Sequence, residues 1–75
     1  MNLKEFREVL DILTPYYKDQ AGYHLGADHD VIYLYATDSP VSESDVKKLF
    51  ELGAGQEGID GFEDYDPEEG WYVFV

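Results

Sequence analysis

The absence of cysteine is the sequence feature that most constrains the fold of this chain. A chain of 75 residues lies near the lower size limit at which one apolar core holds a fold without help. Neither disulfide bridges nor thiolate metal sites are available to it. At 44% hydrophobic residues, with seven Tyr and four Phe, it is too apolar to be a solvating acidic tail. We therefore expect one folded domain over residues 1–75.

Two segments have the spacing and the caps of amphipathic helices. The first is expected over residues 3–14, because Asn2 is followed three residues on by a glutamate and Pro15 disfavours helical geometry at the residue before it. The second begins at Ser42, which is followed three residues on by an aspartate, and ends at Gly53. The apolar faces are formed by Leu3, Phe6, Val9, Leu10, Ile12 and Leu13 in the first helix, and by Val46, Leu49 and Phe50 in the second.

Four short segments rich in β-branched and aromatic residues are typical of strands. They are Tyr23–Ala27 and Val31–Thr37 around the turn Asp28-His29-Asp30, and Phe62–Asp66 and Gly70–Val75 around Pro67-Glu68-Glu69. The glycine-rich segment 53–58 is expected to be a flexible connection. The order helix, strand, strand, helix, strand, strand predicts an α+β fold with a four-stranded antiparallel sheet and both helices on one face.

A sheet that is covered on one face leaves its other face in water. Alternation along the predicted strands places Tyr33, Tyr35 and Tyr72 on that open face, together with Phe74. Two interpretations remain open for this aromatic stripe. It is an interaction surface, since Tyr is common at binding hot spots, or its tyrosines only stabilise the sheet through cross-strand pairs.

The residues that carry metal or catalytic chemistry form no complete motif. Calcium loops that start at Asp60 or Asp64 fail at their required glycine or final glutamate. His24 and His29 are better interpreted as solvated turn residues than as ligands. The serines of segment 39–44 occupy turn and cap positions. We expect no cofactor and no enzymatic activity, and keep a small metal-binding protein as a third interpretation.

The formal net charge is −12, from 17 acidic and five basic residues. Such a charge opposes direct binding to nucleic acid or to an anionic membrane. Residues 1–18 are neutral on balance, and no basic residue follows Lys48. Duplex DNA carries one charge per about 1.7 Å, so twelve charges match about 20 Å of duplex. A globule of this length has a radius of gyration of about 11 Å and hence a similar charge density.

Rows of carboxylates can therefore imitate phosphates and occupy the basic groove of a nucleic-acid-binding protein. Plain solubility and adaptation to high salt are the alternative explanations of the acidity. The candidate partner-binding acids are first Asp60, Glu63, Asp64, Asp66, Glu68 and Glu69, and second Asp28, Asp30 and Asp38. The expected partner is a basic nucleic-acid-binding protein or complex, bound by a monomer or a small homo-oligomer.

Two stretches resemble small acidic proteins encoded by bacteriophages and prophages. They are Asp30–Gly53, with Val31-Ile32-Tyr33-Leu34, Ser39-Pro40-Val41-Ser42-Glu43 and Leu49-Phe50-Glu51-Leu52-Gly53, and the ending Tyr65-Asp66-Pro67-Glu68-Glu69-Gly70-Trp71. Phage proteins of this size and acidity are similar to anti-restriction and anti-CRISPR inhibitors, several of which imitate DNA. The resemblance implies a non-enzymatic inhibitor in the cytoplasm of a bacterial host, with CRISPR effectors among its targets. The chain start lacks an apolar signal segment, which agrees with that location.

Overall fold

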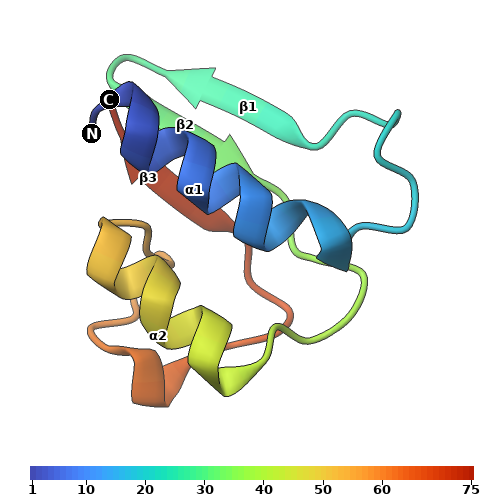
Figure 1. Ribbon diagram of the computed structural model, residues 1–75, viewed down its shortest axis with the longest axis vertical. Coiled ribbons are helices and arrows are strands. Elements are labelled where there is room, and N and C mark those ends of the chain that lie inside the picture. The colour runs from blue at the N-terminus through green and yellow to red at the C-terminus, as the bar shows by residue number, and fades with distance from the viewer.

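Both helices form where their caps and apolar spacing predict them. The computed structural model describes all of residues 1–75 and contains helix α1 at Leu3–Leu13, the single-turn 3-10 helix η1 at Thr14–Tyr16 and helix α2 at Glu43–Leu52 (Figure 1). The Asn2 side chain accepts from the Glu5 N–H at 2.8 Å, and the Glu5 side chain accepts from the Asn2 N–H at 3.0 Å. Ser42 caps α2, and Gly53 ends it in the left-handed region at φ 98°.

The sheet has three antiparallel strands in the order β1-β2-β3. The strands are β1 at Leu25–Asp28, β2 at Val31–Leu34 and β3 at Trp71–Phe74. The predicted hairpin of β1 and β2 is confirmed, although both strands are shorter than expected. Its turn consists of His29 and Asp30, and His29 has a φ of 51°, the left-handed conformation that tight hairpin turns require.

The prediction of a fourth strand over Phe62–Asp66 is wrong. Phe62–Asp64 forms the 3-10 helix η2, and β3 pairs with β2 rather than with this segment. Phe62 and Tyr65, three residues apart, both pack against the core, which suits one helical turn and not the period of two of a strand. The other edge of β3 makes one isolated bridge, between Gly55 and Tyr72.

The buried amide of Gln56 takes the place of a fourth strand's hydrogen bonds. Its side-chain nitrogen donates to the carbonyl oxygens of Asp66 at 2.8 Å and Glu69 at 3.1 Å, and its oxygen accepts from the Asp66 N–H at 3.0 Å. Gln56 is 0% exposed, and the preceding Ala54 and Gly55 are buried as well. The start of the segment expected to be a flexible connection is therefore a fixed part of the core.

Both helices pack against the same face of the sheet. The core joins Val9 and Leu13 of α1 and Val46 and Leu49 of α2 to Leu34, Trp71 and Val73 of the sheet. The Trp71 ring lies at its centre, edge-on to Phe50 at 5.7 Å and stacked with Tyr65 at 5.8 Å between ring centroids. Figure 1 shows α1 lying across the sheet on this side, which leaves the opposite face of the sheet uncovered by helices.

Tyr17 makes the stability of this core sensitive to alkaline pH. Its hydroxyl donates to the Tyr35 carbonyl oxygen, and burial, together with the negative charge of Asp38, raises its pKa from 10.0 to about 12. Between these values the unfolded chain loses this proton while the folded chain keeps it, so stability falls as pH rises from 10 through 12. We expect urea denaturation to show a loss of up to about 2 kcal/mol that Tyr17→Phe removes. If Tyr17→Phe lost the same free energy of unfolding over this pH range, other titrating groups would be its cause.

Candidate functional site

The uncovered face of the sheet carries the aromatic residues that alternation predicts for it. The strand register sets Gly26, Tyr33 and Tyr72 in one row and Asp28, Val31 and Phe74 in the next. Tyr33 is 39% exposed and Phe74 is 56% exposed, and the rings of Tyr72 and Phe74 meet edge to face with their centroids 5.4 Å apart. Tyr35 follows directly after β2, on the same side as Tyr33, and is 59% exposed.

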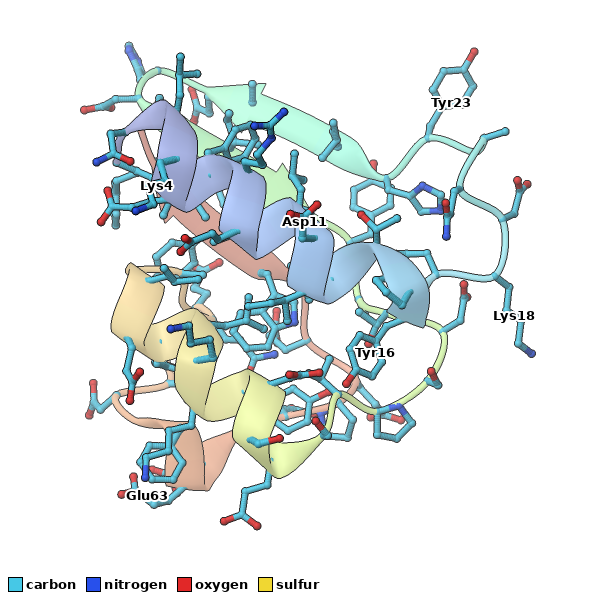
Figure 2. The ribbon with its side chains drawn as sticks, viewed as in Figure 1. Lys4, Asp11, Tyr16, Lys18, Tyr23 and Glu63 are labelled. Carbon is cyan, nitrogen blue, oxygen red and sulfur yellow. The ribbon has the colours of Figure 1, made fainter.

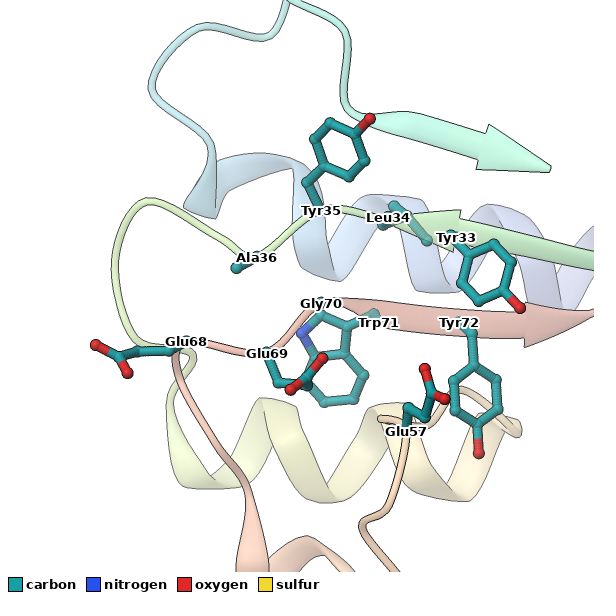
Figure 3. Close-up of a pocket in the computed structure, with 10 residues that line it drawn as sticks. All are labelled: Tyr33, Leu34, Tyr35, Ala36, Glu57, Glu68, Glu69, Gly70, Trp71 and Tyr72. Carbon is teal, nitrogen blue, oxygen red and sulfur yellow. The ribbon is translucent and has the colours of Figure 1, made fainter.

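A hollow of about 390 Å³ lies at the end of this face where β3 begins (Figure 3). Its lining includes Tyr33, Tyr35 and Tyr72, then Gly70 and Trp71, and three acidic residues, Glu57, Glu68 and Glu69. Gly70 permits the close approach of the chain to β2, because a Cβ there would lie 2.6 Å from the Leu34 carbonyl oxygen. A second hollow of about 280 Å³ continues along the face and shares Tyr33, Glu57 and Tyr72 with the first.

Acidic residues lie at both ends of this face. Asp28 and Asp30 stand at the hairpin turn, and Glu57, Glu68 and Glu69 stand at the hollow. We call this surface the open face, and it consists of Asp28, Asp30, Val31, Tyr33, Tyr35, Glu57, Glu68, Glu69, Tyr72 and Phe74. None of its residues is basic.

All five basic residues belong to the helical side of the chain. Lys4 and Arg7 are on α1, Lys47 and Lys48 are on α2, and Lys18 follows η1. Lys4 and Lys18 are exposed, and Figure 2 shows the ammonium group of Lys18 pointing away from the molecule. The charge is therefore polarised through the thickness of the molecule as well as along the sequence, and the open face has no cation of its own to neutralise it.

The remaining predicted acids lie elsewhere or serve the local structure. Asp60, Glu63 and Asp64 are exposed residues in or near η2, and Glu63 lines a separate hollow against α2 (Figure 2). Asp66 is half-buried and accepts from the Glu68 N–H at 2.9 Å. Asp38 accepts from the Lys18 N–H at 2.7 Å. The structure thus brings Glu68 and Glu69 to the open face and leaves Asp60, Glu63 and Asp64 as a second exposed group.

Glu57 is the open-face residue that sequence reasoning missed. It lines both hollows, although its segment was expected to be a flexible connection. The bridge between Gly55 and Tyr72 places it there, with hydrogen bonds of 3.0 and 2.8 Å. Gly55 suits this close packing, because a Cβ there would lie 3.0 Å from the Tyr72 hydroxyl, which would have to shift. A contact between residues so far apart in sequence leaves no local signal.

The histidines form no metal centre with the carboxylates. No group of three or more His, Asp or Glu side chains is arranged to hold a metal ion. The His24 ring packs on Tyr17 at 4.7 Å between centroids, and His29 stands in the hairpin turn. The metal-binding interpretation therefore gains no site from the structure. No helix has both the length and the apolar character to cross a bilayer.

Comparisons of the chain with protein-family models, with curated proteins and with solved structures found no match. The feature of this molecule that points to a function is therefore the open face, with its aromatic rows, its hollows and its uncompensated negative charge.

Proposed function

We propose that this protein is a non-enzymatic inhibitor that binds the basic surface of a nucleic-acid-binding protein and excludes the nucleic acid from it. The observation that carries the proposal is the open face, where aromatic rings lie between two groups of carboxylates and no basic residue intervenes. Such a face complements a surface rich in Lys and Arg, in charge and in its capacity for cation–π contacts.

The overall charge density supports imitation of nucleic acid. The longest extent of the molecule is 27 Å and the formal net charge is −12, which is about one charge per 2 Å. Duplex DNA carries one charge per about 1.7 Å. None of the acidic residues is buried, so the charge stands at the surface where a partner meets it. The radius of gyration of 11.3 Å confirms the size on which the sequence-based comparison depended.

The aromatic residues of the open face supply binding affinity that charge alone does not. Purely electrostatic contacts steer a partner and weaken with salt, whereas buried tyrosines supply much of the affinity at interfaces. On the open face the tyrosines of the interaction-module interpretation lie beside Glu68 and Glu69, two of the acids of the mimicry interpretation. The resemblance to phage proteins favours defence systems of a bacterial host, CRISPR effectors among them, as the class of target.

Release of proteins from DNA-cellulose tests the proposal. A bacterial lysate is adsorbed to the matrix at low salt and washed with this protein, and the released proteins are purified and titrated with it against DNA. We expect release of a small set of proteins that bind either this protein or DNA but never both. A matrix that releases nothing, or released proteins that bind it and DNA together, would contradict the proposal.

A further inference from the structure

The larger hollow of the open face contains an unsatisfied hydrogen-bond donor. Trp71 is 1% exposed, and its indole nitrogen has no hydrogen-bond partner, although other buried side-chain polar atoms are paired. In Figure 3 this nitrogen lies on the side of the ring toward Ala36 and Glu69, which also line the hollow. A buried N–H without an acceptor is unfavourable. Its position at the hollow therefore points to an acceptor that arrives with a ligand.

The rest of the lining selects a flat cation. In Figure 3 the Glu57 carboxylate lies beside the Tyr72 ring, and the Glu69 carboxylate lies nearer the Trp71 indole. A guanidinium group stacks on aromatic rings and bonds carboxylates with two parallel hydrogen bonds, whereas an ammonium group acts as a point charge. A volume of about 390 Å³ is near the lower end of the range for ligand sites, which suits one long side chain.

We infer that this hollow receives a single arginine side chain of the partner protein, and that a backbone carbonyl beside that arginine accepts the Trp71 indole N–H. The inference rests on the proposed function, because it names the contact through which the basic partner is held. The Glu69 side chain is exposed and lines the same hollow, so it is free to change its rotamer as the ligand enters. The guanidinium then lies between the Tyr72 ring and the Glu57 carboxylate.

A short arginine peptide tests this inference without the partner. The probe is Gly-Ser-Gly-Arg-Gly-Ser-Gly with blocked ends, compared with peptides that carry lysine or neutral citrulline in place of arginine. Because the chain has one Trp, its indole N–H gives one signal in a nitrogen-15 NMR spectrum. We expect a saturable downfield shift of that signal with the arginine peptide, weaker binding of the lysine peptide and no binding of the citrulline peptide.

Two double variants that remove the same amount of charge distinguish binding at the hollow from general electrostatic attraction of the peptide. The double variant Glu57→Gln with Glu69→Gln is expected to lower the affinity for the arginine peptide about fivefold, because two solvent-exposed charge contacts are lost. Glu51→Gln with Glu63→Gln removes the same charge elsewhere and is expected to change affinity less than about twofold. Both variants change only exposed side chains.

An indole signal that does not move at saturating peptide, or equal weakening in both variants, would overturn the inference. Its failure is distinguishable from failure of the proposed function. If the protein releases proteins from DNA-cellulose but shows no arginine site, only the hollow's role is refuted. If the arginine peptide binds as expected but no DNA-binding protein is released, only the inhibitory function is refuted.

Discussion

Replacing Gln56 with alanine is expected to lower the free energy of unfolding by about 3 kcal/mol. The change removes three hydrogen bonds to the backbone of Asp66 and Glu69 and leaves buried polar groups unpaired. Total stability for a domain of this size is about 4–11 kcal/mol, so the loss is a large fraction of it. Urea denaturation followed by Trp71 fluorescence measures the effect.

Two further variants make this test specific. Glu57→Ala changes the exposed neighbour of Gln56 and is expected to alter stability by less than about 0.5 kcal/mol. Gln56→Glu keeps the shape but points a carboxylate at two carbonyl oxygens, so it is expected to destabilise strongly at neutral pH and less when acid restores a donor. Wild-type stability in Gln56→Ala would show that segment 66–69 is held by other contacts.

Reversing the charge at the hollow is expected to reduce binding of a basic partner by at least about tenfold. The variant replaces Glu57, Glu68 and Glu69 with lysine, which turns three attractive contacts into repulsive ones on a face that has no other cation nearby. Competition with labelled DNA for a protein released from DNA-cellulose measures the loss.

The matched control replaces Asp60, Glu63 and Asp64 with lysine, at the second exposed acidic group. Both triple variants change the formal net charge from −12 to −6. We expect the control to reduce affinity only about threefold, through weaker long-range attraction. Equal losses in the two variants would mean that total charge, and not the open face, carries recognition.

Local signals in the sequence predict the helices and the first hairpin well. Caps at Asn2, Ser42 and Gly53 act over three or four residues, so they can be recognised without knowledge of the rest of the chain. Segment 62–66 was misassigned because five residues cannot distinguish one helical turn from a strand. Phe62 and Tyr65 pack on the core one helical turn apart, and Gln56 holds Asp66 at the end of the segment; neither contact is local.

The site was predictable to the extent that it depends on alternation within strands. Tyr33 and Tyr72 were assigned to one face from the period of two, and the register pairs them directly. Glu57 could not be assigned, since the bridge of Gly55 to Tyr72 brings it to the face. The division of the acids between the open face and the η2 region likewise depends on how the chain packs.

The most direct test of the central claim is the affinity of this protein for a purified released partner, measured with and without duplex DNA across a salt series. If the open face occupies the partner's nucleic-acid site, duplex and protein compete for one site, and affinity falls by at least about tenfold between about 50 and 200 mM salt. An affinity that is independent of salt, or a complex that holds duplex and protein together, would contradict it.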